Sequence, residues 1–216
     1  DESFISAAYP WVAQEFIEGQ ILCSYSVVRE NTVRAHAVYK GGEFTSSGTA
    51  LGGSIAFVKC DDKTTQLTLQ WVQQFIKANL TSEKEKYCTG QVCFDFIKAK
   101  DGKLYAIECN PRGTSGIHLF NEMATEFTDV FVNDKAKNHS EAVVIPQLNR
   151  HADGMLALAM LVNLTMFCSI EKLIHWIKVF WESKDVMFQW SDPLPFLVGQ
   201  FICIVEPFWK VMYYKI

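Results

Sequence analysis

The sequence predicts an α+β fold: a mainly antiparallel sheet with helices on one face, followed by a helical C-terminal extension. Hairpin patterns predict the sheet, because two β-rich runs joined by a short polar turn pair most readily with each other. A 3.6-residue apolar periodicity predicts the helix that covers it. The observations are the runs Leu22–Arg29 and Thr32–Tyr39 around Glu30-Asn31, the runs Gln91–Lys98 and Lys103–Glu108 around Asp101-Gly102, and the amphipathic segment Thr64–Leu80.

The elements between these landmarks follow from local patterns. The apolar run Trp11–Ile17 predicts a buried strand that ends at Gly19. The glycine-rich segment Lys40–Ser54 predicts a loop, and Ile55–Lys59 predicts a brief strand. Because aspartate caps helices well, Asp61 or Asp62 is expected to begin the helix over 64–80.

Beyond the second hairpin the chain becomes increasingly helical. A helix is expected over Ser115–Glu126, with Thr114 or Ser115 as its cap, and a polar surface loop over Asn133–Asn138. The later segments are rich in apolar and aromatic residues. We therefore expect two units: residues 1–150, a partial domain that holds the sheet, and residues 151–216, an apolar helical extension that packs on it. Its expected helices are Met155–Phe167, Ile170–Trp181 and a last one after the break at Asp192–Pro195.

The composition argues for a folded chain and against nucleic-acid and membrane partners. Hydrophobic residues make up 49% of the 216-residue chain and charged residues 20%, so a packed core is expected. The net charge of −4 comes without a basic block, which argues against a nucleic-acid partner. No run is suited to crossing a bilayer, and no membrane partner is expected. The seven dispersed cysteines form no CxxC pair and predict reduced thiols in the cytoplasm.

The segment Cys93–Arg112 contains the candidate metal-binding and phosphate-binding residues. Asp95 and Glu108 lie in apolar, strand-like stretches on either side of a turn, and Asn110 and Arg112 follow Glu108 at two-residue steps. A hairpin would bring two carboxylates, an amide and a guanidinium together, which suits a hard metal ion and a polyphosphate. The alternative is an edge hairpin whose carboxylates face water or pair with lysines.

The residues around this pair resemble the C-terminal part of an ATP-grasp domain. The matching segments are Thr89–Ile97 and Leu104–Phe120, which contains the sequence E-x-N-P-R. ATP-grasp is the fold of carbamoyl phosphate synthetase, biotin carboxylase and the carboxylate–amine ligases. The resemblance implies that Asp95, Glu108 and Asn110 hold magnesium, with Mn²⁺ as an alternative metal. It also implies that Arg112 contacts phosphate or substrate.

A second segment, Ala13–Gly19, resembles the hinge strand on which this family reads adenine. The resemblance implies that the hinge residues are Gln14, Glu15, Phe16 and Ile17. Gln14 or Glu15 would meet the amino group, and the backbone of Ile17 would meet the ring nitrogen. The family's ribose-binding glutamate has no counterpart at Gln20–Leu22.

The resemblance implies ATP and Mg²⁺ as cofactors and an ATP-dependent ligase that joins a small carboxylate to an amine through an acyl phosphate. The family's phosphate-binding lysines and glycine-rich loop precede the hinge, so this chain is expected to be a partial domain. Its partner would then be a complementing N-terminal subdomain or a second copy of the chain. The rival interpretation is a non-catalytic binding or oligomerisation module.

Overall fold

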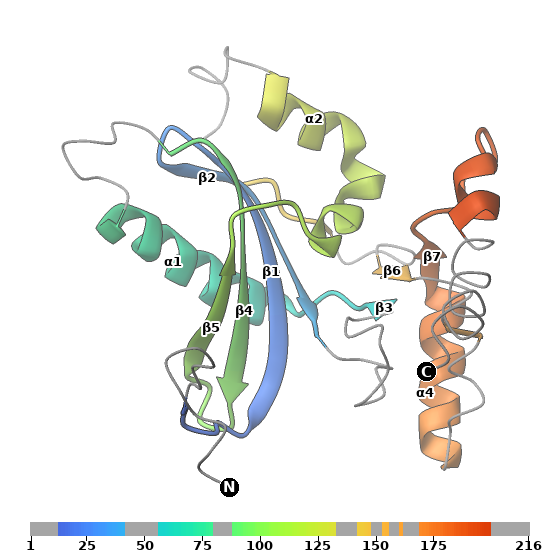
Figure 1. Ribbon diagram of the computed structural model, residues 1–216, viewed down its shortest axis with the longest axis horizontal. Helices are drawn as coiled ribbons and strands as arrows, with labels where there is room; N and C mark the ends of the chain where they lie inside the picture. Colours follow the sequence, from blue (N-terminus) through green and yellow to red (C-terminus); the bar gives the residue numbers. More distant parts are fainter. Residues whose placement is uncertain are drawn as a thin grey trace, which may run out of the picture.

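The structure, a computed structural model, describes residues 13–41, 56–79, 88–132, 142–147, 153–155, 160–161 and 169–199. Its centre is a four-stranded antiparallel sheet with the strand order β2-β1-β4-β5 (Figure 1). A smaller sheet has the order β3-β6-β7. The predicted α+β class with a mainly antiparallel sheet is confirmed. The strands are β1 (Gly19–Arg29), β2 (Thr32–Lys40), β3 (Ala56–Phe57), β4 (Gly90–Ala99), β5 (Leu104–Asn110), β6 (Asp153–Met155) and β7 (Ser183–Asp185).

Both predicted hairpins form, and their turns explain the pairing. Glu30 and Asn31 have φ angles of 48° and 64°, so both lie in the left-handed region that two-residue hairpin turns require. Asn31 also accepts the backbone N–H of Cys88 at 2.7 Å through its side chain. In the second hairpin Gly102 takes a φ of 86°, a conformation that favours glycine.

Helix α1 (Asp62–Asn79) covers one face of the sheet. Asp61 caps it, because its carboxylate accepts the backbone N–H of Thr64 at 2.7 Å. Trp71 of α1 contacts the rings of Phe94 and Phe96 at 5.1 and 5.0 Å between centroids, both in edge-on geometry. The larger apolar core therefore lies between α1 and the face of β4 that carries these two phenylalanines.

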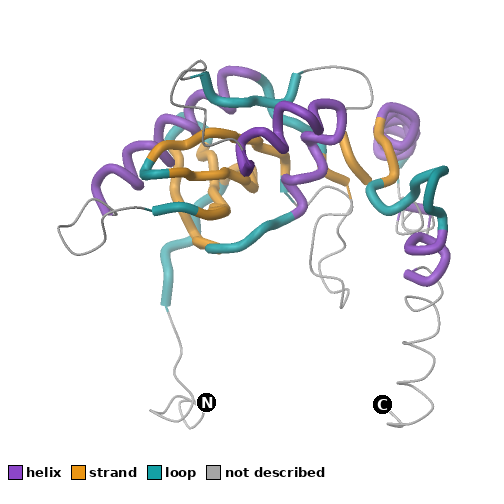
Figure 2. Tube along the Cα trace, turned by 90° about the horizontal axis from the view of Figure 1, so that it is seen from above, coloured by secondary structure: helices purple, strands orange, loops and turns teal. Residues whose placement is uncertain are grey.

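The opposite face is covered by the 3₁₀ helix η2 (Ser115–Met123) and by α2 (Ala124–Val132), so the prediction of helices on one face only was wrong. Figure 2 shows the strands of the main sheet with helices outside them. The reason is that β1 is buried on both faces. Tyr25 is fully buried on the second face, where its ring meets Phe120 at 6.0 Å.

Three further expectations need correction. Residues 13–18 are not in a strand, and Phe16 is 89% exposed, so the predicted buried strand Trp11–Ile17 is wrong over its described part; no neighbouring strand pairs with it there. The predicted helix Ser115–Glu126 is a 3₁₀ helix as far as Met123, since its start contains a glycine of low helix propensity. Met155, the expected start of a helix, pairs with Ala56 as part of β6.

Other expectations are confirmed or fall outside the description. The predicted helix Ile170–Trp181 is confirmed as α4 (Ile170–Glu182), and residues 194–199 are helical. Residues 42–54 of the loop predicted over Lys40–Ser54 lie outside the described residues, whereas Lys40 is the last residue of β2. The loop predicted over 133–138, most of 156–168 and all of 200–216 lie outside them as well. The division at residue 150 stays a prediction. Among the described helices, none is long and apolar enough to cross a membrane.

His36 is a fully buried polar residue between the sheet and α1. Its Nδ1 lies 2.9 Å from the hydroxyl of Ser26, and its Nε2 lies 3.1 Å from the hydroxyl of Thr68. Burial lowers the pKa of His36 to about 3, because the imidazolium would lose its hydration there. The folded chain therefore holds this side chain neutral, with both ring nitrogens satisfied by hydroxyl groups.

We predict that His36 makes the stability of the fold pH-dependent. Below pH 6.5 the unfolded chain binds a proton at His36 that the folded chain does not, so this stability is complete above pH 6.5 and is lost progressively toward pH 3. Between pH 7.5 and pH 5 the loss should be about 2 kcal/mol. Urea unfolding at several pH values measures it. His36→Gln should flatten that dependence, and an equally steep loss in the variant would contradict the assignment.

Candidate metal and nucleotide site

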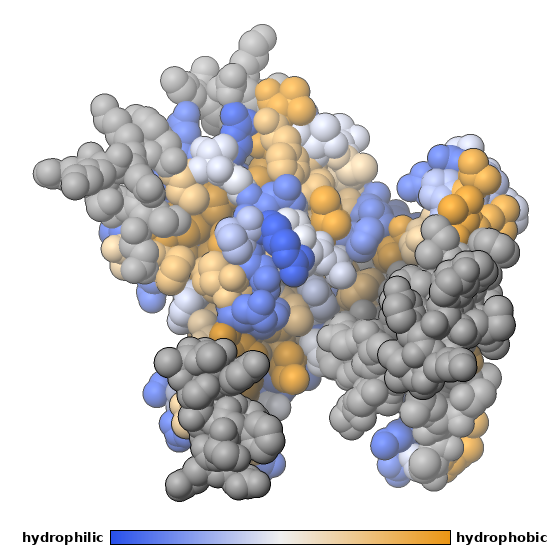
Figure 3. Space-filling model, viewed as in Figure 1, coloured by the Kyte–Doolittle hydropathy of each residue, from blue (hydrophilic) through white to orange (hydrophobic). Residues whose placement is uncertain are grey.

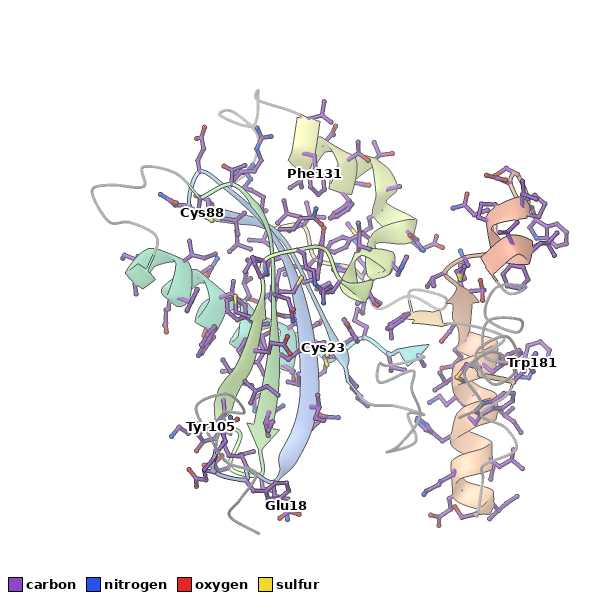
Figure 4. All side chains as sticks on the ribbon, viewed as in Figure 1. Glu18, Cys23, Cys88, Tyr105, Phe131 and Trp181 are labelled. Atoms are coloured by element: carbon purple, nitrogen blue, oxygen red, sulfur yellow. The ribbon has the colours of Figure 1, made fainter. Side chains whose placement is uncertain are left out.

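Asp95 lies midway along β4 and belongs to the face of the sheet opposite α1. Its neighbours Phe94 and Phe96 face α1, and side chains alternate along a strand. In the pairing register Asp95 is directly opposite Cys23 of β1 and Glu108 of β5. Because directly opposed residues share a face, these three side chains form a row across three strands. Figure 4 shows Cys23 in the middle of the sheet.

A β-bulge in β5 brings Glu108 opposite Asp95. Phe96 pairs with Ala106, but the next residue, Asp95, pairs with Glu108, which leaves Ile107 without a partner. Without this extra residue the regular register would place Glu108 opposite Phe94, on the face covered by α1. The bulge therefore moves the second carboxylate onto the face of the first.

Asn110 joins the same face one step further along. It is opposite Cys93, which lies two residues before Asp95 on β4. Because β5 continues to Asn110, Glu108 and Asn110 share a face, as the two-residue spacing predicted. Glu108 is exposed, whereas Asp95 and Asn110 are half-buried. Hydrophilic residues gather over this part of the sheet in Figure 3.

The thiol beside Asp95 stays protonated. Burial, then the negative charge of Asp95 and a hydrogen bond with that carboxylate, together raise the pKa of Cys23 to about 12. Tyr39, opposite Cys23 on β2, also has a raised pKa, chiefly because of burial and then because of Cys23. The row therefore combines two carboxyl side chains with a neutral thiol and a neutral phenol beside them.

Arg112 lies just beyond β5, in a segment held by Cys93. The thiol of Cys93 donates to the carbonyl of Arg112 at 2.9 Å and accepts the hydroxyl of Thr114 at 3.3 Å. The backbone N–H of Arg112 donates to the carbonyl of Asn110 at 2.8 Å. Its guanidinium donates to the carbonyl of Gly113 at 3.3 Å and is exposed, two residues beyond the end of β5.

The predicted hinge residues lie at the other end of β1. Gln14, Glu15 and Phe16 are exposed, and Ile17 is half-buried. They lead into Gly19, which is opposite Ala99 near the turn of the second hairpin. Four strand residues, or about 13 Å, separate Gly19 from Cys23. The structure thus does not bring the hinge residues into contact with the carboxylates, but it connects both through one strand.

A shallow cavity of about 430 Å³ lies at the hinge end and is not part of the carboxylate row. Lys98, one of its lining residues, donates to the hydroxyl of Thr64 on α1 at 2.8 Å, so it reaches toward the opposite face. Glu18 and Lys100 form an exposed ion pair at 2.9 Å on its rim. The lining residues are Glu18, Gly19, Gln20, Lys98, Ala99 and Lys100.

The donors on the Asp95 face fit magnesium better than a softer metal. They are two carboxylates and an amide oxygen, all hard ligands, whereas the adjacent thiol is neutral. Among the described residues, no group of three or more histidine, cysteine, aspartate or glutamate side chains could hold a metal. Two carboxylates suit an ion that keeps water and phosphate oxygens in its shell, and do not form a closed protein cage.

Sequence reasoning missed the part played by Cys23, Cys93 and Thr114. Cys23 and Tyr25 alternate with residues of the α1 face, so the two faces of β1 could be separated from the sequence. Nothing in the sequence reveals that β1 pairs with β4, which brings Cys23 beside Asp95. The contacts of Cys93 depend on that same non-local pairing and on the path of the chain after Asn110.

Comparison with known proteins finds partial structural similarity. No protein-family model and no curated protein sequence matches the chain. Similar solved structures include an L-amino acid ligase from Bacillus licheniformis, with a TM-score of 0.38 and 15% identity over 59% of this chain and 33% of that one. Another is an N5-carboxyaminoimidazole ribonucleotide synthetase from Thermotoga maritima, with a TM-score of 0.33 and 14% identity over 50% of this chain and 26% of that one.

A third is the N5-carboxyaminoimidazole synthetase from Staphylococcus aureus complexed with ADP, with a TM-score of 0.32 and 15% identity, over 50% of this chain and 27% of that one. The chain thus spans about a third or less of the solved proteins that it matches. At such TM-scores and identities the similarity identifies neither an activity nor a ligand.

We predict that the segment after Asn110 depends on the absence of a side chain at Gly116. A Cβ there would lie 2.4 Å from the Cβ of Tyr25, and neither atom can move without the backbone. Gly116→Ala should lower the free energy of unfolding by about 1–3 kcal/mol. The matched control is Gly113→Ala, whose Cβ would meet only the end of the Gln91 side chain at 2.9 Å. Equal thermal stability of the two variants would contradict this packing.

Proposed function

We propose that this chain is the ATP- and magnesium-binding part of an ATP-dependent carboxylate ligase. The observation that carries the proposal is the register of β4 and β5, which places Asp95 directly opposite Glu108 with Asn110 on the same face. Two carboxylates side by side repel each other unless a cation lies between them. The E-x-N-P-R sequence that resembles ATP-grasp domains falls on these same residues.

Asp95, Glu108 and Asn110 would hold Mg²⁺, or Mn²⁺ in its place. When bound, the metal would neutralise the charge of the nucleotide phosphates. The half-buried position of Asp95 fixes its carboxylate among neighbouring side chains, while the exposed Glu108 can adjust to the ligand. The protonated thiol of Cys23 would hold Asp95 in place by donating to it, without competing for the metal.

Arg112 would act on the transferring phosphoryl group. Its exposed guanidinium lies two residues after Asn110. Among the described residues it donates only to a neighbouring carbonyl, so it can turn toward an anion. In the proposed reaction a substrate carboxylate attacks the γ-phosphorus of ATP and gives an acyl phosphate and ADP. An amine then attacks the acyl carbon, and inorganic phosphate leaves.

The nucleotide would lie along β1. Gln14, Glu15, Phe16 and Ile17 would meet the adenine, and the phosphates would extend toward the row that contains Cys23. The separation of about 13 Å along the strand suits an extended nucleoside triphosphate. The exposure of residues 14–16 leaves their polar groups accessible to a ligand or to another protein segment.

A complete enzyme would need groups that face the nucleotide from the other side. In the family that the sequence resembles, lysines and a glycine-rich loop of an N-terminal subdomain supply them. We propose that such a subdomain complements this chain and that small carboxylates and amines are the substrates. Cys23, Cys93 and Cys109 form no disulfide bond, which supports a reducing compartment such as the cytoplasm.

We predict that the 216-residue chain binds ADP and ATP more tightly with Mg²⁺ than without it. Thermal unfolding with each nucleotide, with and without the metal, measures this as a shift in Tm. Glu108→Gln and Asp95→Asn should each lower the nucleotide affinity measured with Mg²⁺ by about tenfold or more, because each removes a charged metal ligand. Mn²⁺ titrated into the nucleotide complex and followed by electron paramagnetic resonance reports the same loss directly.

Glu126→Gln is the matched control, since Glu126 is an exposed glutamate on α2 and not on a strand of the row. It should leave the metal-dependent shift unchanged. If neither nucleotide shifts the Tm with Mg²⁺ present, the chain is a non-catalytic module, and the proposal is wrong. If binding is present but Glu108→Gln and Glu126→Gln behave alike, the nucleotide binds elsewhere.

A further inference from the structure

Helix α4 carries an apolar stripe that no described residue covers. Its members are large and strongly exposed: Ile170 at 68%, Ile174 at 60%, Ile177 at 42% and Trp181 at 74%. They follow each other at spacings of four, three and four residues, so they lie on one side of the helix over three turns. This spacing is that of a helix seam that packs against another helix.

The opposite side of α4 is already anchored. Trp176 and Val179 are buried against Ala56 and Met160, and the indole N–H of Trp176 donates to the carbonyl of Met160 at 3.0 Å. The ring of Trp176 also stacks on Phe180 at 4.9 Å. These contacts fix the rotation of the helix and direct the stripe outward. Figure 4 shows Trp181 projecting from α4 on the side away from the main sheet.

We propose that the stripe is a dimer interface, in which α4 of one chain packs antiparallel against α4 of a second copy. A two-fold axis between Ile174 and Ile177 would place Ile174 against Ile177 of the partner subunit. The same axis would place Ile170 near the partner subunit's Trp181. The sequence of apolar spacings reads the same in both directions, so the stripe is complementary to itself.

The charges beside the stripe fit this partner. Glu171 and Lys178 are exposed and lie on the same flank of the stripe, seven residues apart. In an antiparallel pair related by a two-fold axis, one flank of α4 lies beside the same flank of the partner helix, and the two helices run in opposite directions. Glu171 would therefore lie near Lys178 of the partner subunit, and Lys178 near the partner subunit's Glu171. The two ion pairs favour a second copy of this chain in this orientation over an unrelated apolar surface.

The sedimentation velocity of the full chain, measured from low micromolar to several hundred micromolar, tests the association. A monomer–dimer equilibrium is expected. Ile174→Asp should raise the Kd of the dimer more than about a hundredfold, because it places a charge in the seam. Glu171→Lys should raise it about tenfold, since two attractive contacts become repulsive. Lys172→Glu, which lies on a different side of α4, is the matched control and should leave the Kd unchanged.

Reciprocal charge exchange separates the interface from effects on folding. A chain with Glu171→Lys carries lysine at both flank positions, and a chain with Lys178→Glu carries glutamate at both. Each should associate weakly alone, and an equimolar mixture should regain a dimer at least as tight as the original. A mixture that stays as weak as its components overturns the proposal. So does a chain that is monomeric throughout, including one that instead binds phosphatidylglycerol vesicles through this stripe.

Discussion

The candidate site depends on one irregularity of the sheet, the unpaired residue Ile107 in β5. A regular hairpin with the same turn would leave Asp95 alone on its face and place Glu108 among the phenylalanines under α1. One extra residue reverses the facing of everything that follows it in the strand, because side chains alternate with a period of two. Because of the bulge, the hairpin keeps its phenylalanines on the α1 face and places both carboxylates together on the other face.

One face of β4 packs in the apolar core, and the other face carries the candidate site. Phe94 and Phe96 lie in a cluster of aromatic rings with α1, and this packing fixes the strand. Asp95, between them, is then held on the other face by the alternation alone. Its environment is completed from β1, where Cys23 stays protonated. A mutation in the aromatic cluster would therefore reach the carboxylate through the backbone of β4, although it lies on the opposite face.

The C-terminal part of the described chain contains a helix that is apolar on two sides. Helix α4 attaches through Trp176 and Val179 to a small cluster that includes Ala56, and it leaves an apolar stripe of similar size exposed. A helix that is apolar on two sides needs two partners, and the described chain provides one. The acidic row on β4 and β5 and the stripe on α4 are built from separate elements, so the proposed metal site and the proposed dimer interface can be tested independently.

The sequence by itself determined the class of fold, both hairpins, α1, α4 and the residues worth testing, because turn chemistry and apolar periodicity are local properties. Asn31 and Gly102 favour their turns whatever surrounds them. The tertiary structure alone decided that helices cover both faces and that residues 13–18 stay outside the sheet. It also decided that Cys23 meets Asp95 and that Glu108 reaches its face. These outcomes depend on the pairing of β1 with β4 and on a one-residue bulge, and neither has a local signature, since non-local register is set by the packing of the whole sheet.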